Sequence, residues 1–256
     1  MILLLDTFFL NWQLLLLFFG IAMLYASVGF GGGSSYLAVL VLTGIAYSQI
    51  RATSLLCNIV VVFSNVVFFQ KEKLIHWKKI SPLVFCSVPM AFLGGFIKIN
   101  QTVFFIILGI TLFIASLIMW FSNTTTNYKK QYKTSNYKNA SYGAAIGFIS
   151  GMIGIGGGIF LAPLLHLTHW DTPKKIAATA SVFILVNSIA GLIGQSLNAR
   201  FAIDWHLTSL LLISVAIGGQ IGQRSSHKLL NPMQLKKATA ILIAFVSIRI
   251  LIKYLF

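Results

Sequence analysis

The chain has 256 residues, of which 57% are hydrophobic and only 9% are charged. Soluble domains carry about 25% charged residues because water must solvate their surface, so this composition excludes a soluble globular protein. Nineteen basic residues against four acidic ones give a net charge of +15. The lysines lie in short segments between apolar runs, which argues against a nucleic-acid-binding function.

Ten apolar runs follow one another, and each predicts a helix. Seven reach the roughly 17 residues that an α-helix needs to cross the hydrocarbon core, whereas three are shorter and predict half-helices or re-entrant segments. Broken backbone survives at membrane depth only where protein buries it or a water-filled cavity receives it, so the short runs indicate a cavity. The runs cover residues 7–27, 34–46, 52–69, 82–98, 102–121, 141–153, 159–168, 177–198, 206–223 and 233–255.

The first apolar run and the two cysteines argue against a signal peptide and a cysteine site. No basic segment precedes the first run, so we expect it to be a membrane helix and not a cleaved signal peptide. Cys57 and Cys86 both lie inside apolar runs without a CxxC spacing. They predict neither a disulfide framework nor a metal site.

The second half of the chain repeats landmarks of the first half in the same order. Four matches have offsets between 125 and 128 residues, which predicts a duplicated unit of about five helices. The matched landmarks are Gly29-Phe30-Gly31-Gly32-Gly33 with Gly154-Ile155-Gly156-Gly157-Gly158, Ile50-Arg51-Ala52-Thr53 with Ile176-Ala177-Ala178-Thr179, His76-Trp77 with Asp204-Trp205, and Gly94 with Gly222.

Basic residues predict the orientation of the helices. If each run reverses the direction of the chain, 14 of the 19 basic residues fall on one side, which the positive-inside rule assigns to the cytoplasm, and both termini fall outside. An odd number of helices in each unit makes the second copy enter the membrane from the opposite side. The 14 residues are Lys71, Lys73, Lys78, Lys79, Lys129, Lys130, Lys133, Lys138, Lys174, Lys175, Arg224, Lys228, Lys236 and Lys237.

We therefore predict an all-α polytopic transmembrane bundle built from two inverted repeats with broken or re-entrant half-helices. The first repeat covers residues 1–121, a cytoplasmic connector loop rich in Asn, Thr, Tyr and Lys covers 122–140, and the second repeat covers 141–256. Inverted repeats with broken helices at corresponding places indicate the binding site of a secondary transporter.

The glycine clusters and the polar residues after them are the candidate substrate site. Backbone N–H groups at the start of a half-helix favour an anion, and glycine permits its close approach. The alternatives are that the glycines only permit tight helix crossing and that the polar side chains only join helices. The candidate residues are Gly29, Gly31, Gly32, Gly33, Ser34 and Ser35, then Thr53, Ser54 and Asn58, then Gly154, Gly156, Gly157 and Gly158, and finally Thr179, Ser181 and Asn187.

Arg51 precedes the helix of the first repeat and has no basic counterpart at Ala177. It is either a side chain that snorkels to the interface or an anion attractant at the outer mouth. His166 and His169 are close in sequence, but no carboxylate or cysteine completes a metal site with them. No Ser-His-Asp set or carboxylate pair lies within the membrane runs. We expect no cofactor, no metal and no enzymatic activity.

The duplicated glycine motifs, the Ala-Thr helices and the two tryptophan pairs make the chain resemble the TauE/SafE family of sulfite exporters, from about Tyr25 to Arg224. The resemblance implies a bacterial inner-membrane protein with seven or eight transmembrane helices that transports sulfite, sulfoacetate or a related organosulfur anion. Members of the family usually carry Asp or a similar polar residue before both tryptophans, where this chain has His76 and Asp204.

The sequence thus predicts a secondary transporter, and the resemblance implies that it moves a small inorganic or organic sulfur anion, such as sulfite or a sulfonate, across the cell inner membrane. A passive anion channel and a membrane partner subunit for sulfur handling remain as alternatives. The expected partners are the anionic substrate and the lipid bilayer, with no nucleic acid. Whether the chain forms a homo-oligomer is left open.

Overall fold

The computed structural model describes residues 2–121, 135–198, 201–225 and 232–255, and the regular elements within them are all α-helices. Each predicted run corresponds to one helix, so the all-α class is confirmed. Residues 122–134 of the predicted connector lie outside the described residues. The helices are α1 (Ile2–Ser27), α2 (Gly33–Leu42), α3 (Tyr47–Lys71), α4 (Trp77–Phe96), α5 (Gln101–Phe121), α6 (Asn136–Ile153), α7 (Gly158–Leu167), α8 (Pro173–Ser196), α9 (Trp205–Arg224) and α10 (Pro232–Leu255).

Two of the three short runs form short helices. Helices α2 and α7 have ten residues each, which is too short to cross a bilayer. The run at 141–153 is different, because α6 begins at Asn136 and has 18 residues, so it is not the half-helix that the run predicted. Within the described residues, α1, α3, α4, α5, α8 and α9 are long and apolar enough to span a membrane.

Several helices begin four or five residues before their apolar runs. The first turns of α4, α6 and α8 carry the exposed residues Lys78, Lys138 and Lys174. A pattern search for apolar residues omits such a turn, although a lysine there can bury its stem and keep its ammonium group in water.

The residues before the two tryptophans differ in what they do for the following helix. Asp204 precedes α9, and its carboxylate accepts from the backbone N–H groups of His206 at 3.0 Å and Leu207 at 3.3 Å. His76 occupies the same place before α4 and makes no side-chain cap. Asp204 is therefore a helix cap in this structure, and the first repeat lacks that cap.

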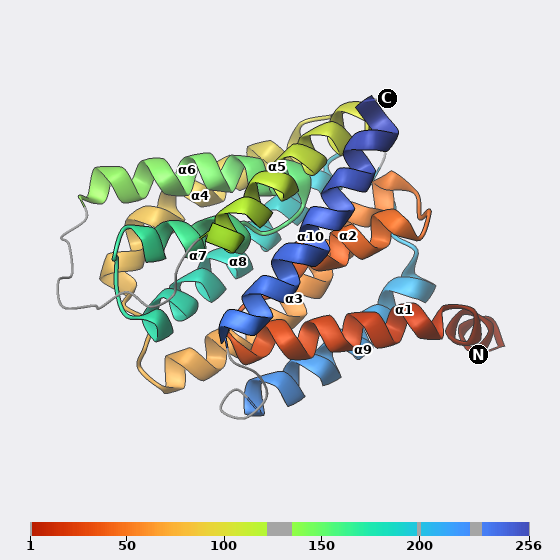
Figure 1. Ribbon diagram of the computed structural model, residues 1–256, viewed down its shortest axis with the longest axis horizontal. Helices are drawn as coiled ribbons and strands as arrows, with labels where there is room; N and C mark the ends of the chain where they lie inside the picture. Colours follow the sequence, from red (N-terminus) through yellow and green to blue (C-terminus); the bar gives the residue numbers. More distant parts are fainter. Residues whose placement is uncertain (1, 122–134, 199–200, 226–231, 256) are drawn as a thin grey trace.

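The helices of one half pack against those of the other. Helix α1 packs on α9 while its counterpart α6 packs on α4, and the corresponding pairs α3 with α8 and α5 with α10 are in contact. Figure 1 shows that α1 and α6 run in opposite directions along the bundle, as do α2 and α7. The arrangement is consistent with the predicted inverted repeat.

Glycines permit the closest of these helix crossings. A Cβ atom added to Gly143, Gly147 or Gly151 of α6 would lie only 2.1–2.5 Å from a carbonyl oxygen of α4. The counterpart crossing has the same design, because a Cβ on Gly218 or Gly222 of α9 would meet a carbonyl oxygen of α1 at 2.4 or 2.0 Å. Small residues at every fourth position let membrane helices approach backbone to backbone.

Candidate functional site

The two glycine loops meet at the centre of the bundle. Gly29 and Gly32 in the first loop, and Gly154, Gly156 and Gly157 in the second, have φ between +80° and +90°. Side chains other than glycine rarely adopt this conformation. The loops touch directly, because a Cβ on Gly33 would lie 2.8 Å from the Ile155 carbonyl oxygen. The glycines therefore shape the break in both helices and allow the loops to cross.

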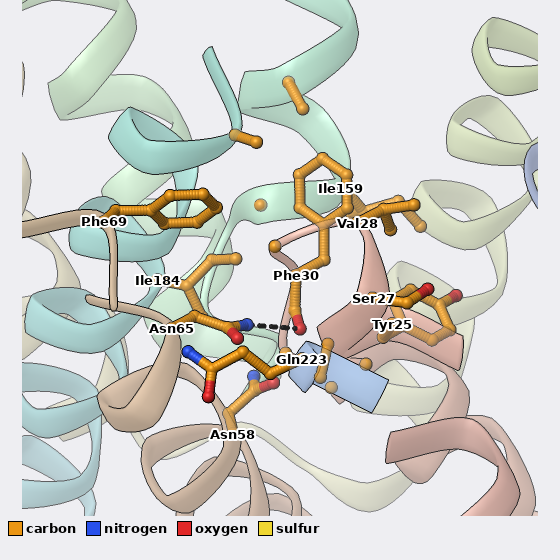
Figure 2. Close-up of a pocket in the computed structure, with 18 of the residues that line it drawn as sticks. Tyr25, Ser27, Val28, Phe30, Asn58, Asn65, Phe69, Ile159, Ile184 and Gln223 are labelled. Atoms are coloured by element: carbon orange, nitrogen blue, oxygen red, sulfur yellow. Dashed lines mark hydrogen bonds between the residues drawn. The ribbon is translucent and has the colours of Figure 1, made fainter. Parts of the chain in front are cut away.

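A cavity of about 730 Å³ lies beside this crossing (Figure 2). Its wall is formed by the end of α1, the first glycine loop, and parts of α3, α7, α8 and α9. Aromatic and aliphatic side chains such as Phe30, Phe69 and Ile159 make up much of it. The cavity reaches the exposed residues Glu72 and Lys174, which lie at the end that the basic residues assign to the cytoplasm.

Both half-helices begin at the cavity wall. The first N–H groups of a helix have no acceptor within it. In α2 these belong to Gly33 and Ser34, because Ser35 and Tyr36 already donate to the Gly32 carbonyl, each at 2.9 Å. In α7 they belong to Gly158 and Ile159. All four of these residues line the cavity, so two positive helix ends face the same space.

Polar side chains of α3 hold the first glycine loop in place. Ser54 Oγ donates to the Gly33 carbonyl at 2.9 Å, and Asn65 Nδ2 donates to the Phe30 carbonyl at 3.3 Å. Asn58 is fully buried, and its Nδ2 donates across the crossing to the Ile155 carbonyl at 2.8 Å. These bonds satisfy backbone carbonyls that the broken helices leave without partners.

The structure divides the predicted site residues into two groups. Seven of them line the cavity, namely Gly29, Gly31, Gly32, Gly33, Ser34, Asn58 and Gly158. The others do not line the cavity. The serine and threonine side chains bond to other parts of the protein: Ser35 to Tyr25, Thr53 to Thr208, Ser54 to the Gly33 carbonyl, Thr179 to the Lys175 carbonyl and Ser181 to the Gly29 carbonyl. The remaining residues, Arg51, Gly154, Gly156, Gly157 and Asn187, are buried elsewhere in the bundle. Whether any of them binds substrate stays a prediction.

Arg51 is not the snorkelling side chain that one of the two predictions described. Its side chain is buried, with 6% of the residue exposed, and Nη2 donates to the Gly151 carbonyl at 3.3 Å. Gly151 belongs to the last turn of α6, where carbonyl groups lack N–H donors within the helix and the helix dipole is negative. The guanidinium group therefore caps α6 and does not snorkel, and its role as an anion attractant stays a prediction.

Gln223 is a cavity residue that sequence analysis missed. It lies near the end of α9, and its Nε2 donates to the Ser64 carbonyl of α3 at 2.8 Å. It closes the apolar run at 206–223, so the pattern marks it only as the end of a helix. Its polar character inside a membrane segment is the signal that could have identified it.

An ion-pair cluster fixes the loop that follows α7. Lys79 Nζ of α4 lies 2.9 Å from Asp171 Oδ2 and also donates to the Trp170 carbonyl. Burial would raise the pKa of Asp171, but its hydrogen bonds with Lys79 and the Thr172 N–H and the positive charge nearby outweigh that effect. The pKa of this carboxyl group is therefore lowered. Asp171 thus stays ionised and joins the second half to α4.

Comparison with known proteins finds one matching family model and several similar membrane proteins. The family model described as "Sulfite exporter TauE/SafE" matches residues 14–250. A Sinorhizobium fredii protein named "Probable membrane transporter protein y4hK" is 34% identical over 245 residues, covering 91% of this chain and 95% of that protein. A Bacillus subtilis protein named "Probable membrane transporter protein YunE" is 27% identical over 199 residues, with 69% and 71% covered. No solved structure matches the chain.

Proposed function

The chain belongs to the TauE/SafE family of membrane transporters, and on that premise we propose that it moves a small inorganic or organic sulfur anion, such as sulfite or a sulfonate, across the cell inner membrane. The convergence of two half-helix N-termini on one cavity is the observation that carries this proposal. A fixed negative charge is stabilised where several free N–H groups and two positive dipole ends meet.

The electrostatics of the cavity favour release as well as binding. Lys174 attracts an anion to the mouth, while Glu72 moderates that attraction. Deeper in the cavity the donors are neutral backbone groups, and no lysine or arginine is among the residues that line its inner wall in the described part of the chain. An anion held by dipoles and not by a full counter-charge leaves more readily, as a transport cycle requires.

The crossing of the loops supports transport by alternating access. Gly33 and Ile155 approach closely where the loops cross, and the cavity reaches the basic end at Glu72 and Lys174. We propose that the two halves rock about this crossing, so that the opposite mouth opens when this one closes. Both termini then lie outside the cell, as the distribution of basic residues predicts.

Chemical modification of the cavity wall tests the proposal. Ala162 of α7 lines the cavity, so Ala162→Cys should react with a negatively charged methanethiosulfonate and lose transport in proteoliposomes. Leu167→Cys on the same helix is the matched control, because Leu167 is 60% exposed on the outer surface and does not line the cavity. Sulfite or a sulfonate should slow the modification of Ala162→Cys and leave that of Leu167→Cys unchanged.

Wild-type protein treated with the same reagent shows how much of the effect comes from the native thiols, Cys57 and Cys86. If modified Ala162→Cys transports as fast as the modified wild type, the cavity is not the substrate pathway. A panel of sulfite, sulfoacetate, thiosulfate and non-sulfur anions, measured by thermal stabilisation, then identifies the substrate class, because ligands that bind only the folded state raise its stability. Equal stabilisation by all anions would contradict selectivity for sulfur compounds.

A further inference from the structure

Three amide side chains in the cavity wall have their nitrogen atoms committed to the backbone. The carboxamides of Asn58, Asn65 and Gln223 donate to carbonyl oxygens at 2.8, 3.3 and 2.8 Å. A carbonyl accepts hydrogen bonds only, so the bonded atom of each amide must be nitrogen, and the chemistry fixes the orientation of all three. Each amide keeps one further N–H and its oxygen, and the oxygen is the atom that can coordinate a cation.

The three amides line the cavity near the break between α1 and α2. Asn58 and Asn65 are seven residues apart and share one face of α3, and the bond from Gln223 to the Ser64 carbonyl brings α9 to the same place. Figure 2 shows the amide ends of the three residues on one side of the cavity, beside Phe30. Asn58 Oδ1 is buried and has no hydrogen-bond partner among the described residues.

A cluster of acceptors beside an anion site requires an explanation. Amide oxygens repel an anion, and a buried acceptor without a partner destabilises the protein. Two helix dipole ends of opposite sign also meet at the break. The negative C-terminal end of α1 lies at Ser27, and the positive N-terminal end of α2 lies at Gly33. Broken membrane helices use such a pair of ends to hold an anion and a cation together.

The ligands indicate which cation fits. Oxygen donors suit hard cations, and the three amides are uncharged. Divalent ions are usually held by carboxylates, and the one acidic residue among those lining the cavity in the described part of the chain is Glu72 near its mouth. A neutral oxygen cluster therefore matches a monovalent ion better than Mg²⁺ or Ca²⁺.

We propose that Asn58 Oδ1, Asn65 Oδ1 and Gln223 Oε1 form a binding site for a sodium ion. A sodium ion there satisfies the buried oxygen of Asn58, and the negative end of α1 at Ser27 favours its charge. Because each ion attracts the other, sodium and the anion raise each other's affinity by the same factor. The coupling rests on the proposed transport of an anion, whereas the sodium site itself does not.

Substitution of Gln223 tests the site with little risk to folding, because this residue is only partly buried. Gln223→Glu adds a negative charge to the ligands and should strengthen sodium binding about tenfold, and Gln223→Met should weaken it by a similar factor. Gln220→Glu is the matched control, since Gln220 is exposed one turn away on the same helix. It makes the same charge change away from the cavity and should leave sodium affinity unchanged.

Sodium binding is measured by the melting temperature of the purified protein as NaCl replaces choline chloride at constant ionic strength. The proposal predicts saturable stabilisation by sodium, altered only in the two Gln223 variants. Stabilisation equal to that by choline, or equal shifts in Gln220→Glu and Gln223→Glu, would overturn it.

Transport separates this inference from the proposed function. Saturable anion flux that is unchanged when choline replaces sodium would overturn the sodium site and leave the proposed function intact. Sodium stabilisation that depends on Gln223, in a protein that moves no sulfite or sulfonate, would support the sodium site and overturn the proposed function.

Discussion

Replacing Gly33 with alanine tests the crossing of the two glycine loops directly. A Cβ on Gly33 would lie 2.1 Å from Asn58 Nδ2 and 2.8 Å from the Ile155 carbonyl oxygen. Ordinary contacts begin at 3.0 Å or more, so the Asn58 amide must move by about 0.9 Å, the difference between 3.0 and 2.1 Å. It then loses its 2.8 Å hydrogen bond to Ile155.

Two contributions give the expected magnitude. Overpacking a close contact destabilises a protein by about 1–3 kcal/mol, and loss of a hydrogen bond adds about 0.5–1.5 kcal/mol. We therefore expect Gly33→Ala to lower the free energy of unfolding by roughly 2–4 kcal/mol. At about 2–4 °C per kcal/mol for a chain of this size, the melting temperature should fall by roughly 4–16 °C.

The matched control is Gly20→Ala in α1, where an added Cβ meets nothing within 4 Å. Alanine favours helix over glycine by up to about 1 kcal/mol, so this variant should melt at or slightly above the wild-type temperature. Both variants are compared by thermal melting in the same detergent. Equal melting temperatures for Gly33→Ala and Gly20→Ala would refute the close approach of the loops.

Three further predictions concern helix ends, pH and orientation. His76→Asp should supply the cap that Asp204 gives to α9 and raise stability by about 1 kcal/mol, seen as a higher melting temperature; an unchanged temperature would contradict a capping role. Asp171→Asn should melt lower than wild type at pH 7, because the lowered pKa means that the ion pair with Lys79 contributes stability above the unfolded pKa of about 3.9. That contribution is lost as pH falls through the folded pKa, so the difference should shrink below about pH 4, and a constant difference would contradict it. Reporter fusions in the connector and at the carboxyl terminus should report opposite sides of the membrane; the same side would overturn the inverted orientation.

Hydropathy and glycine spacing were enough to predict the fold. Each apolar run became a helix, and the runs after Gly33 and Gly158 became ten-residue helices, because the positive φ of the glycines breaks the chain where the sequence shows a cluster. Helix starts were not predictable in the same way. A lysine in a first turn, such as Lys138, interrupts an apolar pattern without interrupting a helix.

The site was predictable only in part, because its chemistry depends on which atoms already have partners. The sequence placed Asn58 among the candidate site residues, but the structure uses an N–H of its amide to bond Ile155 and leaves its oxygen without a partner among the described residues. Arg51 looked like an interfacial residue because only its own helix could be considered, whereas its partner Gly151 lies 100 residues away. Contacts of this range arise from the packing of the two halves.

The most direct test of the account is counterflow in proteoliposomes. With radiolabelled sulfite or a sulfonate outside and the same unlabelled anion inside, an alternating-access transporter predicts saturable uptake that the internal anion accelerates. Uptake that rises linearly with concentration and ignores the internal anion would contradict the account and favour a passive anion channel.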